Sequence, residues 1–352
     1  MNDNIKLPGT RYQGSKRKII NEIYDVMKAY FDPKHILDLF GGTAICSLYF
    51  QMKNIDVTYN DILNFNSINA RGFLNDNIEN IPTKEDIINI FKEKKESKYN
   101  SFIYEKFKDI YYTDSENKEL DIFRENIKQI RNETKREIMY YLIFQSMISK
   151  RPYNLFHRKN LSVRTKNVKR SFGNKVTWDK SFIDHMIKFR NELIKLCQIK
   201  AKQNLGKISI INKSYNEIPD SYLSTIDTVY IDPPYFKKDK KDSQYYENYH
   251  FLEGFLNDDW GTKIDYESKH YKLKKNEKFI INSADKMFDS IIDKYSDKNL
   301  VISYNTNAYP SIEVIEEKLK KKYDKIIIKY FEYNYALSKK KSNEVIIIAL
   351  PS

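Results

Sequence analysis

The segment "KHILDLFGGTA" (34–44) decides the fold of this chain, because it joins a short apolar run to an acid and a pair of glycines. A stretch with helical character, "TAICSLYFQMKN" (43–54), follows it, and then comes a second strand-like run, "IDVTYND" (55–61). A strand, a glycine turn, a helix and another strand in this order are typical of a βαβ unit with parallel strands. The sequence therefore predicts an α/β domain that begins near the N-terminus.

Five further strands are expected in the last third of the chain, where runs rich in Ile, Val and Tyr recur. They are "KISIINKSY" (207–215), "STIDTVYIDPPY" (224–235), "KNLVISYNT" (298–306), "DKIIIKYFEYNY" (324–335) and "NEVIIIALP" (343–351). No helical segment separates the last two, so we expect them to form an antiparallel hairpin at the edge of a mostly parallel sheet.

The middle of the chain has a different character. "KREIMYYLIFQSMISK" (135–150) has helical spacing, and residues 151–179 are dense in Arg, Lys, Asn and aromatic residues. We predict an α/β domain formed by residues 1–74 and 205–352, interrupted by a mainly helical insertion of residues 75–204.

Charge and cysteine content narrow the function classes. The formal net charge of +13 over 352 residues makes a polyanion such as nucleic acid a plausible partner, although a general excess of lysine in the source proteome explains it equally well. Cys46 and Cys197 stand outside any CxxC pattern, and the five histidines lack metal-ligand spacing, so we expect no disulfide scaffold and no bound metal. Without a leader-like N-terminus or a run of about 18 apolar residues, the chain is expected to be cytoplasmic.

Gly41 and Gly42 stand where a parallel strand gives way to a helix, so the backbone bends tightly and a ligand can approach it closely. A GxGxxG pattern and a Walker A pattern are both absent, which disfavours NAD and ATP. The next strand ends in Asp61, at about the distance along the chain where an acid holds a ribose diol. A nucleoside site is indicated, and a plain strand-to-helix connection is the alternative.

Upstream, "RYQGSK" (11–16) precedes an amphipathic segment. Backbone amides at a helix start, together with Lys16, would suit an anionic group such as a carboxylate. The alternative interpretation is a surface loop followed by a basic helix.

A predicted buried strand runs directly into "DPPY" (232–235), so Asp232 emerges at the carboxyl edge of the sheet, where open α/β folds bind ligands. Pro233 and Pro234 fix two φ angles and lack N–H donors, which leaves rigidly held carbonyl acceptors. Asp232 and the Pro233 carbonyl offer two acceptors to an amino group with two hydrogens, and Tyr235 offers a ring face to a planar base.

The turn therefore fits a clamp for an exocyclic NH2 on an aromatic heterocycle. Two acceptors favour a nucleophilic geometry at the nitrogen, and placement against a methyl donor supplies the remaining acceleration without a metal. The alternative is a proline-stiffened turn with an N-capping aspartate.

Taken in order, "RYQGSK", "DLFGGTA", "YND" and "DPPY" resemble the D12 class (Dam-like, α-group) of DNA adenine-N6 methyltransferases over nearly the whole chain. The resemblance implies a Rossmann-like class I methyltransferase fold with a target-recognition insertion, and S-adenosyl-L-methionine as the methyl donor. It implies cofactor roles for Tyr12, Gly14, Lys16, Asp38, Phe40, Gly41, Gly42, Asp61 and Ile62, and catalytic roles for Asp232, Pro233, Pro234 and Tyr235.

Two positions depart from the family pattern. Ser15 stands where the first motif usually has a second glycine before the lysine. Ser214 and Tyr215 stand where the family often carries an acid for the donor's adenine, and they are taken here as candidate cofactor-binding residues.

The basic segment around "SKRPYNLFHRKNLSVR" (149–164) lies where the family has its target-recognition region. An enzyme that modifies an amino group inside a duplex must extrude the base, which requires a surface that grips phosphates and side chains that read base edges. The candidate DNA-binding residues are Lys150, Arg151, Asn154, His157, Arg158, Arg164, Lys169 and Arg170. A solvated basic helix and loop is the alternative, and the loop at 236–250 is a candidate to close over an extruded base.

The leading hypothesis is a site-specific methyltransferase that acts on N6 of a flipped adenine in double-stranded DNA, as a monomer or weak dimer, with a possible cognate restriction endonuclease for the same site. The alternatives are an RNA base methyltransferase and a DNA-binding protein that uses a methyltransferase fold without catalysis. A protein-glutamine methyltransferase is disfavoured, because Asp232 stands where that class usually has Asn. The DNA sequence recognised does not follow from composition.

Overall fold

The computed structural model describes residues 15–95, 98–166, 175–236, 245–274, 281, 283–333 and 342–351. Seven strands form one sheet in the order β3-β2-β1-β4-β5-β7-β6. The strands are β1 (His35–Asp38), β2 (Asp56–Asn60), β3 (Ile208–Ile211), β4 (Thr228–Ile231), β5 (Asn299–Asn305), β6 (Lys325–Tyr333) and β7 (Ser342–Leu350). The predicted strands are therefore all present, and the fold class predicted from the sequence is confirmed.

Strands β1 to β5 pair in parallel, whereas β7 is antiparallel to both β5 and β6. The last two strands pair as expected, but β7 lies inside the sheet and only β6 is at the edge. From β1 the chain runs outward to β2 and β3 on one side of β1, and it then crosses back to β4 on the other side. Open α/β sheets bind ligands at such a switch point, outside the carboxyl ends of the strands.

The described helices vary widely in length. The α-helices are α1 (Ile20–Lys28), α2 (Ile45–Met52), α3 (Asn64–Leu74), α4 (Lys84–Asn89), α5 (Phe102–Lys106), α6 (Asp114–Ile127), α7 (Glu133–Ser149), α8 (Leu161–Thr165), α9 (Lys175–Asp179), α10 (Phe182–Lys200), α11 (Asp220–Leu223), α12 (Tyr245–Phe255), α13 (Ala284–Lys294) and α14 (Ile312–Leu319). Short 3-10 helices are η1 (Lys16–Lys18), η2 (Ile78–Asn80), η3 (Pro152–Asn154) and η4 (Trp260–Lys263).

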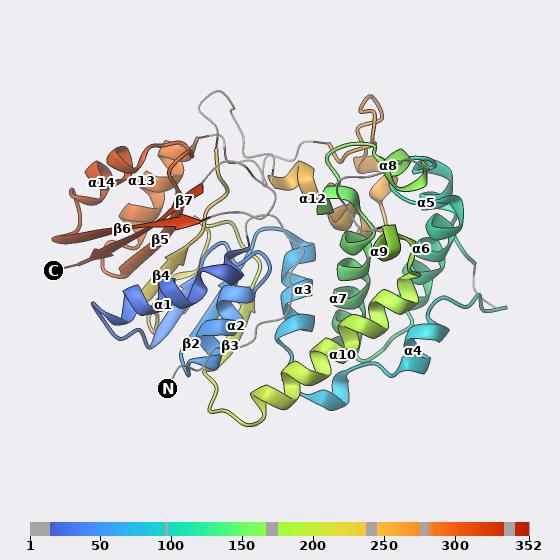
Figure 1. Cartoon of the computed structure of the whole chain (residues 1–352), viewed down its shortest axis with the longest axis horizontal. Helices are drawn as coiled ribbons and strands as arrows, with labels where there is room; N and C mark the ends of the chain where they lie inside the picture. The colour runs from blue at the N-terminus through green and yellow to red at the C-terminus, as the bar shows by residue number, and fades with distance from the viewer. Residues whose placement is uncertain are drawn as a thin grey trace.

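The sheet is covered on both faces, because successive strand residues point to opposite sides. Along β4, for example, Tyr230 belongs to the core shared with α1 and α2, whereas Val229 and Ile231 belong to the core shared with α13 and α14. Figure 1 shows these helix pairs around the sheet, and it shows α4 to α10 together with α12 gathered in a second lobe. Two-sided burial explains why the strands read as continuous apolar runs rather than as alternating ones.

The second lobe is built around α7, which extends over the segment predicted to be helical and is packed between α3 and α10. Helix α3 lies between the sheet and this lobe (Figure 1). Helix α12 joins the same lobe, because Phe251 packs against Phe107 and Tyr111. A division of the chain at residue 205 thus separates segments that pack together, and the domain limits remain a prediction.

Candidate active site

Three aspartates gather where β1, β2 and β4 end, around a cavity of about 230 Å³. Asp38 ends β1, Asp61 follows β2, and Asp232 follows β4. Lys16 and the glycine turn line the same cavity. The sites that the sequence predicted separately, for a nucleoside and for an amino group, therefore share one space at the switch point of the sheet.

The glycine turn is held against the end of β2. Tyr59 donates a hydrogen bond from its hydroxyl to the Gly42 carbonyl at 2.8 Å, and the Gly42 N–H donates to Oδ2 of Asp61 at 3.0 Å. A Cβ on Gly41 would lie 2.2 Å from Cε2 of Tyr59, so only glycine fits there. Gly42 has φ of 47°, in the left-handed region that glycine adopts at little cost.

Asp61 is buried and fixed by the backbone, because its Oδ1 also accepts from the Leu63 N–H at 2.8 Å. Burial raises the pKa of Asp61 to about 6, against the hydrogen bonds from Leu63, Asn66 and Gly42 that favour the charged form. Tyr245 of α12 contributes a further hydrogen bond of this kind, so the helical lobe reaches the acid predicted to hold a ribose.

Asp38 is also buried, and its Oδ2 accepts from the Ser47 hydroxyl at 2.6 Å. Burial raises the pKa of Asp38 to about 7; the Ser47 hydrogen bond opposes this shift, and repulsion from Asp232 and Asp61 adds to it. A cationic ligand in the cavity would relieve the cost of charging these carboxyls.

The turn at residues 232–235, predicted to be catalytic, is contacted by a lysine from the N-terminal motif. Nζ of Lys16 lies 3.0 Å from Oδ1 of Asp232 and donates to the Tyr235 hydroxyl at 2.6 Å, while that hydroxyl lies 3.3 Å from the same Oδ1. Pro233 and Pro234 line the cavity beside them. Burial raises the pKa of Asp232 to about 6 although Lys16 lowers it, so the carboxyl is ionised above neutrality.

The sequence interpretation placed Lys16 at an anionic group of the ligand, but the structure brings its ammonium to the catalytic turn. It also adds Glu344, which the sequence interpretation did not single out. This carboxyl on β7 is 2% exposed, and its Oε2 lies 3.6 Å from Nζ of Lys16. A glutamate inside the apolar run "NEVIII" (343–348) was the available signal, because charged residues are almost never fully buried unless paired.

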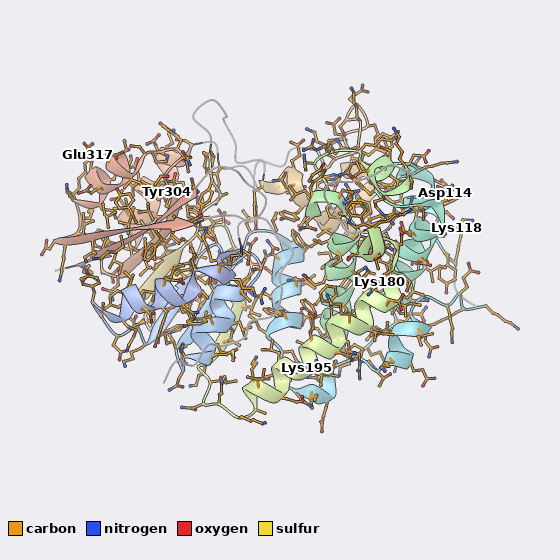
Figure 2. All side chains as sticks on the ribbon, in the orientation of Figure 1. Asp114, Lys118, Lys180, Lys195, Tyr304 and Glu317 are labelled. Atoms are coloured by element: carbon orange, nitrogen blue, oxygen red, sulfur yellow. The ribbon has the colours of Figure 1, made fainter. Side chains whose placement is uncertain are left out.

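The cofactor candidates Phe40, Ile62, Ser214 and Tyr215 all line the cavity. The rings of Phe40 and Tyr215 lie 5.9 Å apart at 33°, which forms an aromatic wall. Tyr304 of β5 is buried in the sheet lobe (Figure 2) and packs edge-on against the ring of Tyr235, with the ring centroids 5.5 Å apart. Tyr12 and Gly14 lie outside the described residues.

Three of the predicted DNA contacts are buried within the protein, and this corrects their proposed role. Lys150 and Arg164 both pair with Glu116, at 2.8 Å and 2.6 Å. Arg151 is 1% exposed and donates to the backbone carbonyls of Tyr111 and Leu155. Their cationic groups are engaged inside the fold, so in this conformation they do not face a phosphate.

The remaining candidates of this segment lie at the surface or outside the described ranges. Arg158 is exposed, and Asn154 and His157 are half-buried, on the turn that follows α7. Lys169 and Arg170 are among the residues that the structure does not describe. In the described ranges, no group of three or more His, Cys, Asp or Glu side chains is arranged to hold a metal, and no helix has the length and apolar character to cross a membrane.

The family model of D12 class N6 adenine-specific DNA methyltransferases matches residues 12–307. The chain therefore belongs to this family of adenine-N6 DNA methyltransferases, as its motifs indicated. It is 28% identical over 350 residues to the type II methyltransferase M2.HphI of Haemophilus parahaemolyticus, with 97% of this chain and 96% of that protein covered. It is also 26% identical over 348 residues to the modification methylase StsI of Streptococcus sanguinis. That alignment covers 88% of this chain but only 46% of that protein.

Proposed function

We propose that this chain transfers a methyl group from S-adenosyl-L-methionine to N6 of an adenine flipped out of double-stranded DNA. The observation that carries the proposal is that the amino-group clamp at Asp232 and the nucleoside turn at Gly41 and Asp61 open into one cavity. A base and a donor bound there lie side by side, and positioning of this kind supplies a large part of the acceleration.

The charges of the cavity fit this donor. Three carboxyls with raised pKa values, Asp38, Asp61 and Asp232, face one buried ammonium, that of Lys16. When bound, the donor supplies an electrophilic methyl group on a positively charged sulfur. Asp61 would accept from the ribose hydroxyls, and Phe40 and Tyr215 would enclose the adenine of the donor.

Asp232 and the Pro233 carbonyl would accept the two hydrogens of the target amino group, and Tyr235 would stack on the base. The nitrogen becomes positively charged as it gains a carbon substituent, so a nearby carboxylate stabilises the transition state more than the ground state. Asp232 therefore needs to be ionised, and Lys16 needs to leave room at its Oδ1.

We further propose that the turn after α7, with Asn154, His157 and Arg158, faces the DNA. Such a surface is needed because N6 is hidden in the base stack until the adenine is extruded. The names of the two relatives, a type II methyltransferase and a modification methylase, support a role in restriction and modification, with an endonuclease of the same specificity as the partner. We expect the chain to act as a monomer or weak dimer.

The test measures transfer of a labelled methyl group to DNA from a methylation-deficient host, followed by mapping of the modified adenines. Wild-type protein should modify N6 in one sequence context, and Asp232→Ala should abolish transfer while donor binding persists. Asp258→Ala is the matched control, because this aspartate is 80% exposed and pairs with Lys128 in the helical lobe. Undiminished transfer by Asp232→Ala, or transfer by the wild type to RNA alone, would overturn the proposal.

A further inference from the structure

The ammonium of Lys16 is held between two carboxyls from different parts of the sheet. Oδ1 of Asp232, after β4, is 3.0 Å from Nζ, and Oε2 of Glu344, on β7, is 3.6 Å away. Both Lys16 and Glu344 are almost completely buried, at 3% and 2% exposure. Glu344 does not line the cavity; it contacts the ammonium of Lys16, and its charge also raises the pKa of Asp232.

The position of Lys16 creates a competition at the clamp. Its ammonium already lies against Oδ1 of Asp232, one of the two carboxylate oxygens that could accept from the target amino group, and an ammonium binds a carboxylate more strongly than a neutral amine does. The lysine must therefore move away from Asp232, or share it, each time a base enters. Moving a buried ammonium without a second anion nearby would leave an uncompensated charge, which is strongly unfavourable.

Glu344 provides that second anion, because its carboxylate already lies 3.6 Å from the ammonium. When the ammonium of Lys16 shifts toward Glu344, the carboxylate of Asp232 is left to face the positive charge that develops on N6.

We propose that Glu344 is a positioning residue that takes over the ammonium of Lys16 when Asp232 binds the amino group of the target adenine. The inference rests on the role proposed above for Asp232. It assigns to the buried glutamate of β7 a part in the methyl transfer that the cavity lining alone does not reveal.

Glu344→Gln keeps the shape of the side chain but removes its charge, so Lys16 would keep Asp232 and the Tyr235 hydroxyl and lose its second carboxylate. The rate of single-turnover methyl transfer at saturating donor is expected to fall about 10- to 100-fold, as for other changes that misplace a catalytic group. Glu344→Asp restores the charge at a shorter reach and should recover part of the rate. Donor affinity and melting temperature should change no more than in Asp227→Asn, a carboxyl at the opposite end of β4 that accepts from the Lys34 and His35 N–H groups.

A double substitution separates this role from a structural one. Lys16→Met leaves Asp232 and Glu344 as two buried like charges, so adding Glu344→Gln to Lys16→Met should raise the transfer rate, although Glu344→Gln alone lowers it. A side chain that only supports the fold would lower the rate in both backgrounds.

The pH profile gives a second readout that packing alone would not move. The charge of Glu344 raises the pKa of Asp232, so the acid limb of the rate profile should shift to lower pH in Glu344→Gln. The other titratable or charged groups that act on or near Asp232 are Lys16, Tyr235, Asp38, Cys46 and Tyr230.

The outcomes are distinct. Three results together support the inference. The transfer rate falls in Glu344→Gln, it rises when Glu344→Gln is added to Lys16→Met, and the acid limb of the rate profile shifts to lower pH in Glu344→Gln. The inference is overturned by a wild-type rate in Glu344→Gln. It is also overturned if Glu344→Gln lowers the rate equally in the wild-type and Lys16→Met backgrounds and leaves the pH profile unchanged. Neither result would contradict the role proposed for Asp232. If Glu344→Gln does not fold, the inference predicts a reduced rate for Glu344→Asp, whose carboxylate has a shorter reach to Lys16, and a wild-type rate there overturns it. If Asp232→Ala retains transfer, the proposed function itself fails.

Discussion

Methyl transfer by this enzyme should depend on pH through Asp232. In the proposed role, its carboxyl stabilises the positive charge on the reacting nitrogen only when ionised, and burial raises its pKa to about 6. Above pH 7 the carboxylate form dominates, and the rate should be nearly constant. As the pH falls through 6, the carboxyl takes up a proton and the negative charge beside the reacting nitrogen is lost.

The size of the effect follows from the pKa. A carboxyl with a pKa of about 6 is about 99% ionised at pH 8 and about 9% ionised at pH 5, so the rate should fall about 11-fold between these values. Loss of donor binding would add to this, because the pKa values of Asp38 and Asp61 are raised to about 7 and about 6. Single-turnover measurements with saturating donor remove that contribution.

Protonation of Asp38, Asp61 and Asp232 does not lower the rate of methyl transfer by unfolding the protein. A carboxyl whose pKa is higher in the folded than in the unfolded chain stabilises the fold when protonated, and this stabilisation is lost as the pH rises through the folded pKa. Titration of Asp38, Asp61 and Asp232 from pH 8 to 5 therefore favours the native state while the rate falls. Circular dichroism at each pH serves as the control for unfolding caused by other groups.

A rate that stays constant from pH 8 to 5, or one that rises on acidification, would refute the reasoning. The reasoning would also be refuted if only the dissociation constant of the donor changed at low pH while the single-turnover rate did not. The clamp would then not require ionised Asp232.

Gly41→Ala is expected to destabilise the fold by about 1–3 kcal/mol and to weaken donor binding, because the added Cβ would lie 2.2 Å from the ring of Tyr59. Melting temperatures measured with and without donor check both effects, and an unchanged melting temperature would contradict the prediction. Arg164→Ala should destabilise by about 3 kcal/mol, because buried Glu116 loses one of its partners, while the salt dependence of DNA affinity stays unchanged. Arg158→Ala should leave the melting temperature unchanged and reduce the slope of log affinity against log salt by about 1, and an unaltered slope would remove this residue from the DNA surface.

Much of the fold was predictable, because the residues that favour strands and turns locally are also the ones that the folded protein buries or needs at those turns. The run before Asp38 and the run before Asp232 are apolar on both faces, which is typical of central parallel strands, and glycine or proline follows each one. The turn chemistry is equally local, since only Gly41 fits against Tyr59. Short-range signals of this kind do not need the rest of the molecule.

Side-chain roles in the helical lobe were less predictable, because charge in the sequence does not reveal whether a cation faces solvent or the interior. Lys150 and Arg164 looked like phosphate contacts, but Glu116, some 34 to 48 residues earlier, binds both. Arg151 instead donates to backbone carbonyls that only the packed lobe brings together.

The sequence by itself determined the order of motifs, the α/β class and the chemistry of the Asp232 turn, because these depend on residue type and near neighbours. Only the tertiary structure decided that the Lys16 ammonium faces Asp232 and that Glu344 lies behind it. These residues are separated by more than 100 positions in the chain, and they meet because β7 lies inside the sheet beside β5, next to β4. Strand order is a property of the whole sheet. The pairing of the Lys16 ammonium with two carboxylates therefore could not be predicted from any one segment of the sequence.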